Sequence, residues 1–154
     1  MANTYTQMYA QIVFTPKGRE HLILPSFEAH LYQYITGIVK ASNQKLIAIN
    51  GMPDHVHIFL GFKPTLRLSD LVSDVKTGSS KFIKAKGYLP GTFAWQDGYG
   101  CFTYAHAQLD TVAQYVMRQK QHHQKQTFRE EYADLLEQAG VAYDDRYMFE
   151  FYEI

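Results

Sequence analysis

Two histidines separated by one residue suggest the first chemistry in this sequence. His55 and His57 lie in the stretch Pro53–Leu60, whose apolar and β-branched residues predict a strand. Side chains two residues apart in a strand point to the same face, with Cα atoms about 7 Å apart. Both imidazoles can therefore reach one cation. The pair predicts a metal site, although a His-x-His pair in a strand is more often structural.

A second group lies on a predicted helix, Leu109–Gln124. Tyr115, Gln119 and His123 are spaced i, i+4 and i+8, so they share one helical face. That face is polar, and a neighbouring apolar stripe would dock the helix. A tyrosine hydroxyl can attack phosphorus, and an amide oxygen can bind a hard cation. A lone tyrosine on such a helix is usually a packing residue, so the two groups are persuasive only together.

The hydrophobic spacing predicts the elements that hold these groups. They are a strand within Thr4–Phe14, a helix capped by Ser26 that ends near Ala41, strands over Lys45–Ile49 and His55–Phe62, a helix from Leu68 to about Gly87 containing Gly78, and a strand in the later half of Phe93–Ala105. The turn Asn50–Asp54 would join the two middle strands into a hairpin. This order predicts an α+β, ferredoxin-like (RRM-like) split βαβ fold, a four-stranded antiparallel sheet with two helices on one face.

The length of 154 residues suits one domain. We expect a single domain over residues 1–154, with a core over 4–106 and with the tyrosine helix and a helical tail over 108–154. The tail includes a second helix, Phe128–Gln138. Alternation in the hairpin would bury Val56, Ile58 and Leu60 under the first two helices and leave the histidines on the other face.

The composition excludes several classes of protein. A single cysteine, Cys101, rules out an internal disulfide framework, and no apolar run approaches the roughly 20 residues that span a bilayer. The N-terminal residues do not resemble a signal peptide. We therefore expect a soluble cytoplasmic protein with no membrane partner.

The charges balance overall, 15 basic against 15 acidic residues, but they are unevenly distributed. Between Lys63 and Lys86 there are six basic residues against two acidic ones, whereas residues 127–154 hold two basic residues against eight acidic ones. This asymmetry favours one phosphate-facing surface and one solvated tail. Two ordinary solvated helix faces would explain it equally well.

Three segments together carry a family resemblance: Asp54-His55-Val56-His57, Leu68–Ser80 with its Lys-Thr-Gly-Ser-Ser run, and Tyr115–His123 followed by Thr127–Tyr132. In combination, and over almost the whole chain, they resemble the single-tyrosine HUH transposases of the smallest bacterial insertion sequences. The resemblance implies that Tyr115 is the nucleophile and that His55, His57 and Gln119 hold Mg²⁺ or Mn²⁺. It also implies a homodimer acting on single-stranded DNA with hairpins at the element ends.

In such enzymes the tyrosine helix of one subunit completes the histidine pair of the other, and attack leaves a covalent 5′-phosphotyrosine and a free 3′-hydroxyl. The glycine pair that relatives often carry before this helix is absent from Tyr104–Asp110. A metal, Lys120 or Arg118 would favour the phenolate. We expect His122 and His123 to lie at a solvated helix end.

Basic and aromatic residues supply the predicted DNA contacts. The basic ones are Lys76, Lys81, Lys84, Lys86, Arg118 and Lys120. Tyr88, Phe93 and Trp95 could stack on unpaired bases, although core packing is the commoner role for each.

Three other functions remain open from the sequence. A domesticated relative would use the same chemistry to process chromosomal repeat palindromes. A non-catalytic module would bind single-stranded nucleic acid on the same type of sheet. A hydrolytic metalloenzyme would use the histidine pair while Tyr115 only packs.

Overall fold

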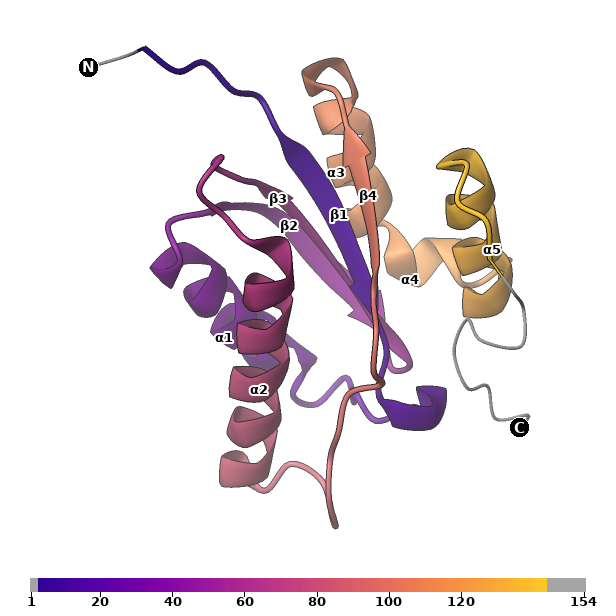
Figure 1. Ribbon diagram of the computed structural model, residues 1–154. Helices are drawn as coiled ribbons and strands as arrows, with labels where there is room; N and C mark the ends of the chain where they lie inside the picture. Colours follow the sequence, from indigo (N-terminus) through magenta and orange to yellow (C-terminus); the bar gives the residue numbers. More distant parts are fainter. Residues whose placement is uncertain (1–2, 144–154) are drawn as a thin grey trace.

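A four-stranded antiparallel sheet forms the centre of the protein (Figure 1). The computed structural model describes residues 3–143. Its strands are β1 (Tyr9–Phe14), β2 (Lys45–Met52), β3 (His55–Gly61) and β4 (Gly100–Tyr104), in the spatial order β2-β3-β1-β4. With α1 (Glu28–Ala41) after β1 and α2 (Leu68–Lys86) after β3, this order is the predicted ferredoxin-like α+β fold.

The two faces of the sheet carry different helices. Val56, Ile58 and Leu60 of β3 are buried in the core beneath α1 and α2, as alternation predicts. His55 and His57 point to the opposite face. The helices on that side are α3 (Leu109–Met117), α4 (Gln119–His122) and α5 (Phe128–Gln138) (Figure 1). Short 3-10 turns, η1 (Lys17–Arg19) and η2 (His106–Gln108), complete the described elements.

The helices α1 and α2 pack closely at a glycine. A Cβ at Gly78 would lie 2.8 Å from Cδ1 of Ile38, so only glycine permits this approach without a shift of the isoleucine. The helix continues unbroken through Gly78 and ends at Gly87, which has a left-handed φ of 64°. The prediction that Ser26 caps α1 was wrong, because Phe27 is the N-cap and no side chain caps the helix.

The turn of the β2–β3 hairpin is shorter than predicted. Asn50 and Gly51 belong to β2 and pair with His57 and Val56. These two residues, which were predicted to form the turn, are therefore part of the sheet. The chain reverses after Met52. Within residues 3–143, no helix is long and apolar enough to cross a membrane.

The last described helix, α5, docks on β1 and β4. Phe128 and Tyr132 are buried with Val13 and Phe102 in a small cluster of their own. A Cβ at Gly100 would lie 2.7 Å from the Tyr132 hydroxyl. The absence of a side chain at Gly100 therefore leaves the space that the Tyr132 ring occupies. The helix is thereby held against the sheet face that carries the histidines.

Candidate active site

The two histidines are fully buried and oriented alike. The Nδ1 atom of His55 donates to the Asp54 carboxylate at 2.7 Å, and Nδ1 of His57 donates to the Gln11 side-chain oxygen at 2.5 Å. Both acceptors are oxygens, so each ring carries its proton on Nδ1 in these bonds. The two Nε2 atoms are therefore left to face the same space, which suits a metal ligand.

Glu131 of α5 occupies that space. Its Oε1 lies 3.1 Å from Nε2 of His57, 3.4 Å from Nε2 of His55 and 2.9 Å from Nε2 of His123. Its Oε2 accepts a hydrogen bond of 2.9 Å from the Gln119 amide. The carboxylate is only 1% exposed, and a buried charge of this kind needs these partners.

Tyr115 reaches the same carboxylate from α3. Its hydroxyl donates a short hydrogen bond to Oε2 of Glu131, and its ring lies edge-on to that of His57 with centroids 6.0 Å apart. Gln119 Oε1 lies 3.0 Å from Nε2 of His55. The structure thus brings together four sequence-predicted residues of one chain, His55, His57, Tyr115 and Gln119, around a fifth that was not predicted.

The tyrosine helix breaks where one continuous helix was predicted. Arg118 has φ −97° and ψ 18°, which separates α3 from α4. The carbonyl of Met117 at this break accepts a 3.0 Å hydrogen bond from the Asn50 side chain. Tyr115, Gln119 and His123 still share one face despite the break. The backbone N–H groups of His122 and His123 donate to carbonyls one turn earlier and so keep the chain helical.

The cluster sets the protonation of its members. Burial favours a higher pKa for Glu131, but the contacts that its carboxylate makes with the rings of His123, His55 and His57 outweigh burial and hold this pKa far below its usual range. Burial also disfavours a charged His55, yet its bonds to Asp54 and Glu131 raise its pKa to about 9. Burial dominates at His57 and lowers its pKa.

The tyrosine is held in its neutral form. Burial, and then the charge of Glu131, raises the pKa of Tyr115. The predicted cationic neighbours do not counter this effect. Lys120 Nζ turns away to Glu28 at 2.9 Å and to the Gly51 carbonyl at 2.6 Å, and Arg118 is exposed. The nearest charged group to the hydroxyl is therefore a proton acceptor.

The donor set fits a divalent metal. His55, His57 and Glu131 each offer a ligand atom, and these atoms lie within 4.8 Å of one another. The oxygen of Gln119 faces His55 and can join them. Two imidazole nitrogens with carboxylate and amide oxygens suit Mn²⁺, and the oxygens suit Mg²⁺.

Sequence reasoning missed two residues of the site. Glu131 was counted in an acidic tail, although it shares a helical face with Phe128, Tyr132 and Leu135, all of which are buried. A carboxylate on an apolar stripe is the signal that could have identified it. Gln11 on β1 gave a weaker signal, a polar residue between apolar neighbours in a buried strand.

His122, the last residue of α4, and His123, its C-cap, also contact the cluster. His123 bonds Glu131 and its side chain is only 5% exposed, while His122 Nε2 lies 3.5 Å from Oε2 of Glu131. The expectation of a solvated helix end was therefore wrong for His123, whereas the side chain of His122 is 34% exposed. The Glu131 carboxylate is fixed in position because histidine side chains contact it both from the sheet and from the end of α4.

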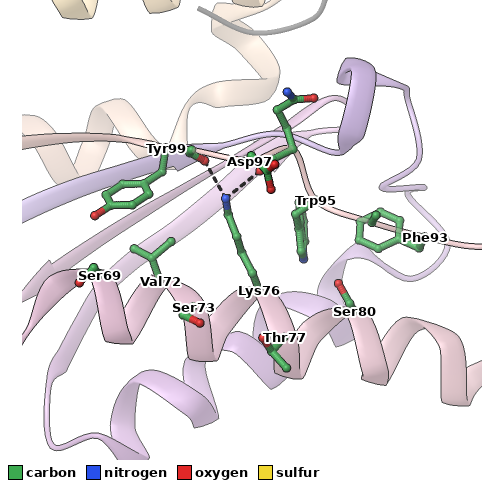
Figure 2. A pocket seen from close by; sticks show the side chains of 13 residues that line it. Ser69, Val72, Ser73, Lys76, Thr77, Ser80, Phe93, Trp95, Asp97 and Tyr99 are labelled. Atoms are coloured by element: carbon green, nitrogen blue, oxygen red, sulfur yellow. Dashed lines mark hydrogen bonds between the residues drawn. The ribbon is translucent and has the colours of Figure 1, made fainter.

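The lysines of α2 lie across the sheet from this cluster. Lys81, Lys84 and Lys86 are exposed. Lys76 differs, because its ammonium donates to the carbonyls of Gln96 at 2.8 Å and Gly98 at 2.6 Å. Figure 2 shows it turned toward that loop, at the edge of a cavity of about 440 Å³. Burial lowers its pKa. In this arrangement Lys76 anchors a loop.

The candidate stacking aromatics are mostly core residues. Phe93 and Trp95 are each 8% exposed, and Trp95 packs edge-on against Phe14. Tyr88 is half-buried and stacks on Phe27 with ring centroids 4.6 Å apart. Phe93 and Trp95 therefore pack in the core, which the sequence analysis gave as the commoner role for such residues.

Comparison with known proteins identifies the family and the fold of the chain. The family described as "Transposase IS200 like" matches residues 4–119, and the chain belongs to this family of transposases. Its fold is similar to a crystal structure assigned as a transposase from Deinococcus radiodurans R1 (22% identity, TM-score 0.62, covering 77% of this chain and 95% of that one). It is also similar to a REP-associated tyrosine transposase bound to a REP hairpin (15% identity, TM-score 0.59, covering 100% of this chain and 97% of that one). No curated protein matches the chain.

Proposed function

We propose that this transposase cleaves and rejoins single-stranded DNA through a covalent 5′-phosphotyrosine on Tyr115. The observation that carries the proposal is that the Tyr115 hydroxyl donates to Glu131, whose other carboxylate oxygen lies 3.1 Å from Nε2 of His57, on the same face of the sheet. Membership of the family supports the same reaction class.

His55, His57, Glu131 and Gln119 would hold a divalent metal, Mg²⁺ or Mn²⁺. When bound, the metal would polarise the scissile phosphate and stabilise its developing charge. Asp54 and Gln11 fix the two imidazoles with Nε2 toward the site. The sequence predicted three protein ligands, His55, His57 and Gln119. The proposed set adds the Glu131 carboxylate to these three.

Glu131 is placed to take the proton of the nucleophile, a transfer that requires the low pKa of Glu131 and the raised pKa of Tyr115 to move toward each other when substrate binds. The Tyr115 oxygen forms a bond to phosphorus while its hydroxyl proton passes along the existing hydrogen bond to Oε2 of Glu131. The bond from phosphorus to the 3′-oxygen breaks, and that oxygen leaves as a 3′-hydroxyl after taking up a proton. Attack by a 3′-hydroxyl on the phosphotyrosine reverses these steps and rejoins DNA.

The site is complete within one chain, and we propose that Tyr115 acts on the histidine pair of its own subunit. Exchange of the tyrosine helix between subunits of a homodimer, which the sequence resemblance implies, is the alternative. Homodimer formation and a cytoplasmic location stay predictions.

The proposed substrate is single-stranded DNA that carries hairpins at element ends. The similar REP-associated transposase is bound to a REP hairpin, which supports hairpin recognition by the shared fold. A domesticated enzyme that processes chromosomal repeat palindromes would use the same site. DNA flanking the gene separates the two, because hairpins close to both ends indicate a mobile element.

The proposal is tested with a labelled single-stranded oligonucleotide and Mg²⁺. The native chain is expected to form a covalent protein–DNA adduct on a denaturing gel, and Tyr115→Phe is expected to form none. Tyr5→Phe, which removes the hydroxyl of a tyrosine that is 88% exposed, is the control and should retain the adduct. An adduct on folded Tyr115→Phe would show that another residue is the nucleophile, and its absence from every folded variant would favour a non-catalytic binding module.

A further inference from the structure

Polar side chains connect the break in the tyrosine helix to the edge strand β2. The Asn50 side-chain amide donates a 3.0 Å hydrogen bond to the carbonyl of Met117, the last residue of α3. Asn50 pairs with His57 across the β2–β3 hairpin, so the two side chains lie on the same face of the sheet. This contact therefore links the tyrosine helix to the strand next to the one that carries the histidines.

Lys120 makes a second connection at the same edge. Its ammonium donates to the Gly51 carbonyl at 2.6 Å and to the Asn50 side-chain oxygen at 3.4 Å, and it lies 2.9 Å from Oε2 of Glu28. Glu28 is the first residue of α1. One lysine thus joins α4 to the edge strand and to a helix on the other face of the sheet, and we call Asn50, Lys120 and Glu28 the edge latch.

The place of the edge latch along the chain decides which side chains it can position. Met117 comes two residues after Tyr115, and Lys120 comes directly after Gln119. The two contacts therefore flank the helix break between the proposed nucleophile and a proposed metal ligand. A shift of the chain at this break would move Tyr115 relative to the histidines.

Apolar packing does not by itself fix the rotation of the tyrosine helix. Val112 and Val116 of α3 are buried with Ala48 and Phe59 of the sheet. Such contacts are non-directional, whereas a hydrogen bond depends on both distance and angle. The bond from Asn50 to the helix break therefore supplies the directional contact that apolar packing lacks.

We propose that Asn50 and Lys120 are positioning residues for Tyr115, and that the edge latch sets the direction from which its hydroxyl meets the scissile phosphate. A misplacement of about 1 Å can slow such a reaction about a hundredfold. Both residues act through the helix, because the hydroxyl itself donates to Glu131. This inference rests on the proposed function for the role of Tyr115 as nucleophile.

The test measures single-turnover adduct formation on a single-stranded oligonucleotide with Mn²⁺. Asn50→Ala should lower the rate at saturating oligonucleotide about tenfold and change the half-saturating concentration by less than about twofold, because it misplaces the nucleophile and leaves DNA binding intact. Lys120→Met should lower the rate about threefold, since the Lys120 side chain is 43% exposed. Lys125→Met, which removes another exposed lysine near α4, is the control and should react at the native rate.

Two further variants show whether the contacts form one latch. Asn50→Asp keeps an acceptor for Lys120 but loses the donor to Met117, so it should be as slow as Asn50→Ala. Because Asn50 and Lys120 hold the same helix break, the double variant of Asn50→Ala and Lys120→Met should be about as slow as Asn50→Ala alone. Multiplied effects in the double variant, a native rate in Asn50→Ala, or a change only in the half-saturating concentration would overturn the assignment.

Hydrogen exchange separates this inference from the proposed function. In Asn50→Ala the backbone amides of residues 115–123 should exchange faster than in the native chain, while those of β4 should not change. If Tyr115→Phe abolishes the adduct while Asn50→Ala keeps the native rate, only the role of the edge latch fails. If no variant forms an adduct but exchange responds as expected, only the proposed chemistry fails.

Discussion

The two faces of the sheet differ in the burial of their polar side chains. On the face beneath α3–α5, His55, His57, Gln119 and Glu131 are almost completely buried and hydrogen-bonded to one another. On the face that α1 and α2 cover (Figure 1), the sheet carries apolar side chains, and Lys81, Lys84 and Lys86 of α2 are exposed. One sheet therefore separates a buried, hydrogen-bonded polar cluster from a surface with exposed lysines.

This difference predicts how each face responds to substitution. A buried polar group without its partner is costly, so the members of the buried polar cluster depend on one another. An exposed lysine contributes through long-range attraction to phosphates, which salt screens and which several lysines share. Changes on the first face should be large and specific, and changes on the second should be small and dependent on salt.

Substitution of the central carboxylate should have the largest effect. Glu131→Gln retains the shape of the side chain but removes the charge and the proton acceptor that Tyr115 contacts. We expect Mn²⁺ affinity, measured by electron paramagnetic resonance, to fall by about a hundredfold, because loss of an outer partner alone costs about 10–100-fold. Adduct formation should fall at least as far.

The neighbouring residue provides the control for this change. Glu130→Gln alters an exposed carboxylate that only contacts the Thr127 cap of the same helix. It should leave both Mn²⁺ affinity and adduct formation at native values. Equal effects of the two substitutions would mean that charge near α5, and not the buried contact, governs the site.

Removal of a support behind the histidines should have an intermediate effect. Gln11→Leu leaves Nδ1 of His57 without its acceptor, so the ring is no longer fixed with Nε2 toward the site. We expect about a tenfold loss of Mn²⁺ affinity and a destabilisation of about 1–3 kcal/mol in urea unfolding.

A second buried glutamine separates stability from function. Gln44 bonds backbone groups of Lys63 and Ser42, away from the cluster. Gln44→Leu should be destabilised to a similar degree with unchanged Mn²⁺ affinity. If both variants lose affinity equally, the role assigned to Gln11 is only structural.

The smallest effect on DNA binding is expected at Lys76. Its ammonium donates to the carbonyls of Gln96 and Gly98 (Figure 2), whereas Lys84 on the same helix is exposed. Lys76→Gln should lower the free energy of unfolding by about 1 kcal/mol and leave the salt dependence of hairpin binding unchanged. A loss of salt dependence equal to that of Lys84→Gln would place Lys76 among the DNA contacts.

The fold followed from the sequence because alternation and helical spacing agree with tertiary packing in its first hundred residues. Val56, Ile58 and Leu60 specified the buried face of β3, and the order of elements then left one topology. The prediction that Asn50 and Gly51 form the turn was wrong because strand pairing outweighed their local preference for turns. The break at Arg118 had no local signal, since Asn50 of a distant strand satisfies the carbonyl of Met117 there.

The site was only partly visible in the sequence because spacing reveals neighbours within one element. Tyr115 and Gln119 share a helical face, and His55 and His57 share a strand face, so each pair could be recognised. Glu131 and Gln11 enter from other elements, and only packing of α5 against β4 brings the carboxylate to the histidines. The residues beyond position 143, part of the predicted tail, lie outside the described residues.

The central claim, that the histidine pair and the tyrosine of one chain form one site, is tested most directly by complementation. Tyr115→Phe and His57→Ala chains are co-expressed, and adduct formation is measured on each chain by mass. The account predicts no adduct on either chain, while native chains mixed with Tyr115→Phe form it normally. An adduct on the His57→Ala chain would contradict the account, because its tyrosine would then have used the histidines of the partner subunit.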